Sequence, residues 1–135
     1  MATPPSSGPN GGTATAPPGL TGTAALDLWR RALVASVRRD GPDLSARQLA
    51  LLLTVYLTPP PHTVRGLAAH LEVSKPAVTR ALDRLSQEGF VKRKIDPADR
   101  RNVLVQRTVR GSVHLSEFAD LVARSAGEAM GAGGP

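Results

Sequence analysis

The chain has 135 residues, a net charge of +6 at pH 7 and no cysteine. This length suits one domain, and the lack of thiols excludes disulfides, cysteine-ligated zinc and a thiol redox switch. No stretch approaches the roughly 18 apolar residues of a membrane span, and the N-terminus lacks a secretory signal pattern. We therefore expect a cytoplasmic protein with no membrane partner, and the positive charge favours polyanionic partners.

The first 23 residues carry no charged side chain and are rich in Pro, Gly and Thr. Leu20 is their only sizeable aliphatic residue, which is too little apolar surface to offset the entropy lost on ordering. We expect a disordered leader over residues 1–23, a folded part over residues 24–126 and a flexible, Gly-rich tail over residues 127–135.

The first predicted helix covers residues 24–39, where apolar side chains recur at helical spacing. This apolar stripe consists of Leu26, Trp29, Leu33, Val34 and Val37. Because the single tryptophan belongs to the stripe, we expect it to pack against the rest of the fold.

Two further helices follow before the basic part of the chain. Ser45 and Gln48 form an S-x-x-Q capping box that opens the second helix, which must end at the triple proline of residues 59–61. Thr63 is a suitable N-cap for the third helix, and only a short turn separates that helix from the fourth.

The fourth helix opens at Ser74, an effective N-cap, with Pro76 tolerated in its first turn. Gly89 ends it as a residue in left-handed conformation would. Its buried face is predicted to consist of Val78, Ala81, Leu82 and Leu85. The outer face has short side chains at its start and basic ones further along, which suits a helix that enters a major groove N-terminal end first.

Strand-like patterning follows the fourth helix, over residues 90–95 and 103–107. The turn-forming segment 96–102 joins them and carries two arginines at its far side. Thr108 then caps a last helix, which we expect over residues 108–126. These elements predict a mainly α fold with a small β-hairpin wing, a winged helix-turn-helix.

The whole net charge lies between His62 and Arg110, a stretch that contains eleven basic and five acidic residues. Apolar residues are spaced through this block, so it is a folded surface rather than a charged tail. Contact with phosphates is the commonest use of such a surface, and a merely solubilising role is the alternative.

Residues 67–111 read LAAHLEVSKPAVTRALDRLSQEGFVKRKIDPADRRNVLVQRTVRG. They contain the patterns S-x-x-x-V-T-R, L-x-x-x-G-x-V-x-R, D-P-x-D-R-R and T-x-x-G. This string resembles the MarR (multiple-antibiotic-resistance regulator) family of winged helix-turn-helix transcriptional regulators. The resemblance implies sequence-specific binding of double-stranded DNA.

On the fourth helix, the resemblance and the predicted geometry together nominate six DNA-binding residues: Ser74, Lys75, Ala77, Thr79, Arg80 and Arg84. Arg80 is the best candidate for a bidentate contact with guanine, and Thr79 or Ala77 could meet a thymine methyl group. Lys75 and Arg84 suit phosphates, although Arg84 could instead pair with Glu88 at i,i+4.

In the wing, the resemblance implies that Arg101 enters the minor groove and that Asp99 orients it. A guanidinium suits the negative potential of a narrow minor groove, whereas the alternative is a simple ion pair that closes the turn. Lys94 and Arg100 complete the nominated wing residues. The run from Lys92 to Lys94 could equally keep an edge strand from pairing with other chains.

Members of this family usually dimerise through long N- and C-terminal helices, with the effector pocket between these helices and the DNA-binding lobe. The helices expected here, over residues 24–39 and 108–126, are short, which leaves both a homodimer and ligand sensing open. The alternative function is a winged-helix protein-interaction module that docks on another regulator or on the transcription machinery. This alternative is suggested by four apolar residues that we expect to lie exposed on the last helix: Leu115, Phe118, Leu121 and Val122.

An enzyme is not expected, because the sequence shows no nucleophile–base pair at suggestive spacing and no Gly-rich phosphate loop after a strand. The three histidines do not form a metal-ligand pattern, so we also expect neither a metal nor a cofactor.

Overall fold

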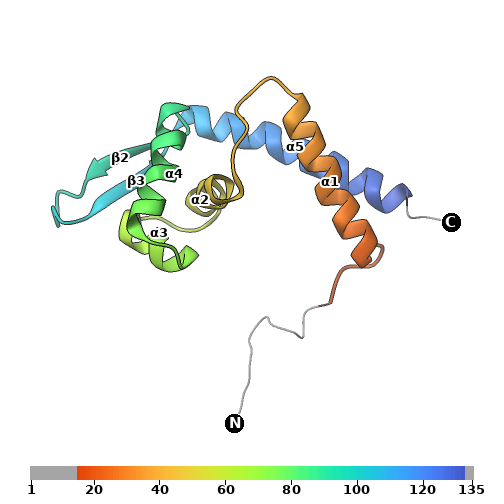
Figure 1. Ribbon diagram of the computed structural model, residues 1–135, viewed down its shortest axis with the longest axis horizontal. Coiled ribbons are helices and arrows are strands. Elements are labelled where there is room, and N and C mark those ends of the chain that lie inside the picture. Colours follow the sequence, from red (N-terminus) through yellow and green to blue (C-terminus); the bar gives the residue numbers. More distant parts are fainter. Residues whose placement is uncertain (1–14, 133–135) are drawn as a thin grey trace, which may run out of the picture. The chain divides into compact units, whose positions relative to one another are not determined.

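The computed structural model describes residues 15–132, so most of the expected leader and the last three residues lie outside the described part. The chain divides into two compact units, one holding residues 39–119 and the other the segments on either side of them. Figure 1 gives the order of the elements along the chain. Each unit is described by itself below.

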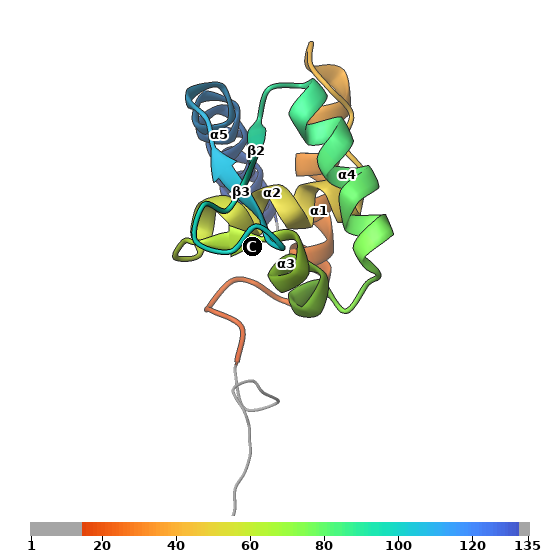
Figure 2. The same cartoon turned by 90° about the vertical axis from the view of Figure 1, so that its left-hand side faces the viewer.

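The larger unit is a winged helix-turn-helix. It contains α2 (Ala46–Leu57), α3 (Val64–Leu71) and α4 (Lys75–Gln87), followed by the β2–β3 hairpin, which is the wing. The hairpin joins β2 (Val91–Ile95) to β3 (Val103–Arg107) in antiparallel register. In Figure 2 the hairpin points toward the viewer, with α3 and α4 beside it. The expected fold class is therefore confirmed.

A third strand, β1 (His62–Thr63), was not predicted. It pairs with β3 and gives the sheet the order β1-β3-β2. Two residues are too few to show an alternating pattern, so this strand depends on its pairing with Val105 and Leu104 rather than on a local sequence signal.

The core of this unit lies where α2, α3 and α4 meet the base of the sheet. The residues predicted to face inward from α4 are buried there, with Val78, Leu82 and Leu85 fully inaccessible to solvent. Each such side chain contributes about 1.5–3 kcal/mol to folding when it leaves water. The other core members are Leu51, Leu52, Val55, Leu67, Ala68, Ala81, Phe90, Val91 and Val105.

The predicted helix caps are present. Ser45 Oγ accepts from the Gln48 amide at 3.1 Å, and Gln48 Oε1 accepts from the Ser45 amide at 2.8 Å, which completes the capping box. Thr63 caps α3 and Ser74 caps α4 through their hydroxyl oxygens. Gly89 has a φ of 78°, the left-handed conformation expected after α4.

Thr108 and Gly111 of the T-x-x-G pattern tie the last helix, α5 (Val109–Ala132), to α2 and the start of β2. The Thr108 hydroxyl donates to the Gly89 carbonyl at 2.7 Å and accepts from the Gly111 amide at 2.9 Å. The Tyr56 hydroxyl donates to the Phe90 carbonyl and accepts from the Thr108 amide. A Cβ at Gly111 would overlap this hydroxyl and the Phe90 carbonyl, so the position requires glycine.

The predicted end of the last helix at Ala126 is wrong, because α5 continues to Ala132. Glycine at position 127 costs about 1 kcal/mol relative to alanine in a helix, which made a stop plausible. Burial on the other side of the glycine offsets that cost, since Ala129 is only 2% exposed. The tail expected over residues 127–135 is thus helical for six of its residues.

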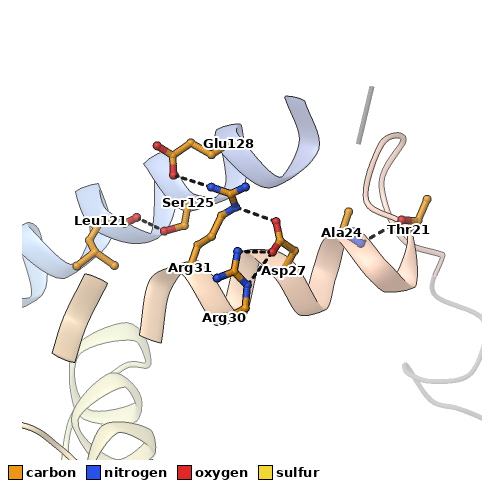
Figure 3. Close-up of polar contacts among 8 residues, drawn as sticks. All are labelled: Thr21, Ala24, Asp27, Arg30, Arg31, Leu121, Ser125 and Glu128. Carbon is orange, nitrogen blue, oxygen red and sulfur yellow. Dashed lines mark hydrogen bonds and ion pairs between the residues drawn. The ribbon is translucent and has the colours of Figure 1, made fainter. Parts of the chain in front are cut away.

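The smaller unit contains α1 (Gly22–Arg38) and the C-terminal part of α5. Thr21 Oγ1 accepts from the Ala24 amide at 3.1 Å, so the helix begins two residues before the predicted start. Figure 3 shows Arg31 between Asp27 of α1, at 2.7 Å, and Glu128 of α5, at 3.6 Å.

One face of α1 is apolar and exposed, which contradicts the packing role predicted for Trp29. The side chains of this face, called here the α1 stripe, are Leu26, Trp29, Leu33 and Val37, with exposed fractions from 43% to 74%. On α5, in contrast, Phe118 and Leu121 are buried, and Leu115 and Val122 are partly buried. The four residues expected to lie exposed on the last helix are thus buried or partly buried, whereas the α1 stripe is exposed.

Candidate nucleic-acid interface

The outer face of α4 carries most of the residues nominated from the sequence. Ser74, Lys75, Thr79 and Arg80 are all exposed on its N-terminal half. Ala77 is only 7% exposed and belongs to the buried face. Its nomination is therefore corrected, and Thr79 is the exposed member of the two residues considered for a thymine methyl group.

Arg84 is engaged within its own helix. Its Nε lies 3.3 Å from Glu88 Oε2, which is the i,i+4 pair considered as the alternative to a phosphate contact. The first turns of α4 thus form an open surface, whereas Arg84, further along the helix, is partly exposed and paired with Glu88.

At the tip of the wing, Asp99 holds the side chain of Arg101. Arg101 Nε donates to Asp99 Oδ1 at 3.0 Å and Nη2 donates to Oδ2 at 2.9 Å. The Arg101 amide donates to the same carboxylate at 3.1 Å. These hydrogen bonds, with a smaller effect of the Arg65 charge, lower the pKa of Asp99 below its ordinary value, so the carboxylate stays ionised.

The guanidinium of Arg101 nevertheless remains open to solvent, with 82% of its side chain exposed. The bidentate contact fixes its direction without covering it. Lys94 and Arg100 are also exposed on the wing. The predicted pairing of Asp99 with Arg101 is therefore present, and it suits both an orienting role and a turn-closing one.

A hollow of about 220 Å³ separates the wing from the first turns of α3 and α4. Four cationic side chains line it: Arg65, Lys75, Arg93 and Arg101. We call this group the cationic hollow. Arg93 is in turn held by Asp83 of α4, with 2.8 Å between Nη2 and Oδ1.

Two members of the cationic hollow were not nominated from the sequence. Arg65 is in the first turn of α3, two residues after the cap Thr63, and a basic residue near a helix start was the available signal. Arg93 was considered both for DNA contact and as a charge that protects an edge strand, and it was not among the nominated residues. Its contact with α4 depends on the packing of the hairpin, which no local pattern reveals.

A second cleft, of about 390 Å³, is lined by Arg39, Phe90, Arg110 and His114, among others. The His114 ring stacks on Phe90 with 4.2 Å between centroids, and the Arg39 guanidinium lies 3.3 Å from its ring nitrogens. Burial, and then the Arg39 charge, lower the pKa of His114 below its ordinary value. The neutral ring can accept a hydrogen bond from Arg39.

Among residues 15–132, no group of three or more histidines, aspartates or glutamates is arranged to hold a metal ion. Within the same range, no helix has the length and apolar character needed to cross a membrane.

Residues 44–103 match the model of the MarR family. Among solved structures, wild-type MarR from E. coli in its apo form is 27% identical, with a TM-score of 0.61, covering 87% of this chain and 84% of that one. A mutant of E. coli MarR complexed with operator DNA is also 27% identical, with a TM-score of 0.61 and coverage of 79% and 74%. The S. aureus MepR–DNA complex shares the fold at 19% identity, with a TM-score of 0.60 and coverage of 74% and 77%.

The matched residues include α2, α3, α4 and most of the wing, and the same winged-helix architecture is found in these solved proteins. Over residues 44–103 the chain is therefore similar to the MarR family, and its fold resembles that of solved MarR proteins.

Proposed function

We propose that this protein is a transcriptional regulator that binds double-stranded DNA in a sequence-specific manner. The cationic hollow carries the proposal, because four basic side chains from α3, α4 and the wing meet beside an exposed helix N-terminus. Such a concentration of positive charge is what contact with phosphates requires. A mutant of E. coli MarR, 27% identical to this chain, was solved in complex with operator DNA and supports the same function.

In this proposal α4 enters the major groove with its N-terminal half. Arg80 offers a guanidinium fork to guanine, and Thr79 offers its methyl group to thymine. Ser74 and Lys75 at the start of the helix lie where phosphates would approach. The wing reaches the adjacent minor groove, where Arg101 inserts in the direction fixed by Asp99, and Lys94 and Arg100 contact the flanking backbone.

We further propose that two copies associate through the α1 stripe and the helices around it. An exposed apolar patch of this kind marks an interface, and a twofold dimer would place two α4 helices on an inverted repeat. Action on genomic DNA would place the protein in the cytoplasm, at the nucleoid.

Affinity selection of genomic fragments on the purified protein, followed by a salt titration, tests the function. If the four cations of the hollow each neutralise one phosphate, affinity should fall about 100-fold between about 50 and 200 mM salt. Failure to bind any fragment at about 50 mM salt contradicts the proposal.

The alternative is a protein-interaction module that docks on another regulator or on the transcription machinery. The α1 stripe is the observation that favours it, because an apolar face suits a protein partner as well as a second copy. Stoichiometric co-purification of a partner that covers the cationic hollow would support this alternative, whereas a homodimer that protects DNA in footprinting would contradict it.

A further inference from the structure

Asp83 is an acidic residue on the surface that is proposed to face DNA. It lies on the outer side of α4, and 61% of its side chain is exposed. A carboxylate in this position repels phosphates and by itself weakens DNA binding. An exposed ion pair also adds little to folding stability. The acidic residue at position 83 is therefore explained neither by a gain in DNA affinity nor by a gain in folding stability.

The contact of Asp83 is with the wing. Asp83 Oδ1 lies 2.8 Å from Arg93 Nη2, and Arg93 is the central residue of β2, opposite Val105 of β3. Among residues 15–132, no other ion pair joins α4 to the β2–β3 hairpin.

Apolar packing does not hold the outer part of the wing to α4. Val91 is the only buried residue of β2, and the four residues after it are exposed, including Ile95 at 47%. The inner end of the hairpin is therefore fixed by the core. Further out, the Asp83–Arg93 pair is the side-chain link to the helix.

We propose that Asp83 is a positioning residue, which fixes the wing relative to α4 through Arg93. The inference rests on the proposed function. It assigns Asp83 to specificity: helix and wing reach neighbouring grooves, so their mutual orientation sets which DNA geometry satisfies both at once. Because Arg93 lines the cationic hollow, the same contact also fixes the direction of one of its four charges.

Two other roles of Asp83 give different results and serve as outcomes of the test. If its charge alone matters, its removal tightens binding to all DNA. If its carboxylate accepts a hydrogen bond from a cytosine amino group, its removal relaxes specificity whether or not Arg93 is present.

The experiment compares Asp83→Ala with Glu72→Gln, which removes an equal charge from an exposed residue in the turn before α4. Affinity is measured for a selected genomic fragment and for its scrambled version. We expect Asp83→Ala to lower the ratio of the two affinities by about threefold to tenfold, with scrambled DNA bound at least as tightly as before. We expect Glu72→Gln to leave the ratio unchanged.

A double-mutant cycle with Arg93→Ala then tests the route of the effect. In the Arg93→Ala background, Asp83→Ala should cause no further loss of the ratio, because the contact is already absent. An equal loss in both backgrounds overturns the proposal in favour of direct base contact. If Asp83→Ala and Glu72→Gln change the affinity ratio equally, the proposal is overturned and the charge alone explains the effect.

A measurement without DNA separates this inference from the proposed function. In the free protein, Asp83→Ala should lower the backbone ¹⁵N order parameters of residues 92–102, whereas Glu72→Gln should not. An unchanged wing in the Asp83→Ala variant contradicts the positioning role even if the wild-type protein binds DNA. Loss of wing order in a protein that binds no DNA would refute only the proposed function and the specificity assigned to the contact.

Discussion

Arg101 combines two properties that a DNA-reading side chain needs. It is 82% exposed, yet two hydrogen bonds to Asp99 fix the direction of its guanidinium. A long flexible side chain usually loses conformational entropy when it binds. In the proposed DNA-binding role, the contact with Asp99 would remove part of that entropy before DNA arrives and so would pre-organise the residue for insertion.

Replacing Arg101 therefore tests the wing. We expect Arg101→Ala to weaken binding of a selected DNA fragment on the order of tenfold. Arg101→Lys should recover only part of the loss, because an ammonium keeps the charge but cannot make the bidentate contact. Arg124→Ala, which removes the same charge from an exposed residue of α5, is the control. Equal losses in Arg101→Ala and Arg124→Ala would show that only net charge matters.

His114 is the residue whose environment predicts a pH effect on stability. Burial and the nearby Arg39 lower its pKa in the folded protein, while the charges of Glu117 and Glu88 partly oppose this shift. The unfolded chain therefore binds the proton more readily than the folded one. The stabilisation is fully present above the unfolded value of about 6.5 and is lost as the pH falls through the lower folded value.

The measurement is the free energy of unfolding in denaturant between about pH 7.5 and pH 5, across the ordinary histidine pKa. We expect His114→Gln to unfold with a smaller loss of stability over this range than the wild-type protein. His70→Gln, at an exposed site on α3, is the control and should keep the wild-type dependence. A wild-type slope in the His114→Gln variant would assign the pH effect to other groups.

At the level of elements, the features that could be predicted from the sequence are those that depend on neighbouring residues. The capping residues Ser45, Thr63 and Ser74 were identified because each needs only its own first turn. The buried face of α4 was identified because a helix has a fixed period. The wing strands were located by their alternation, within one residue of their observed bounds.

Elements and contacts that depend on distant parts of the chain could not be predicted. β1 forms only because β3 lies beside it, and α5 passes Gly127 only because Ala129 is buried beyond it. Likewise, Ala77 was nominated by the resemblance and the predicted geometry together, although its side chain is buried. The pairing of Asp83 with Arg93 depends on how the hairpin folds back toward α4.

The junction of α2, β2 and α5 gives a prediction at this scale. Gly111→Ala should lower stability by about 1–3 kcal/mol, because the new methyl group overlaps the Tyr56 hydroxyl and the Phe90 carbonyl. Gly127→Ala is the matched control in the same helix, since a Cβ there meets nothing within 4 Å. It should raise stability by up to about 1 kcal/mol.

Denaturant unfolding of both variants provides the measurement. Opposite signs for the two substitutions would support the close packing at Gly111. An unchanged or raised stability of Gly111→Ala would show that the Tyr56 hydroxyl can move aside at little cost, and the T-x-x-G pattern would then need another explanation.

At the scale of the whole molecule, the cationic hollow and the α1 stripe lie on different units. The cationic hollow belongs to the winged-helix unit, and the α1 stripe belongs to the other. A single winged helix contacts only one half-site, which limits both affinity and specificity. A second copy joined through the α1 stripe would double the contacts without any change in the reading surface.

This separation predicts that association and half-site recognition can be uncoupled. Trp29→Glu should convert a dimer to a monomer in sedimentation analysis, because it places a charge in the centre of the α1 stripe. The variant should lose most of its affinity for an inverted repeat with half-site centres about 10 base pairs apart, yet bind a single half-site as the wild type does. Leu57→Glu, at a 75% exposed site on α2, is the control and should stay dimeric. If Trp29→Glu leaves both the mass and the affinity for the inverted repeat unchanged, the α1 stripe is not the contact between copies, and the alternative of a different protein partner gains support.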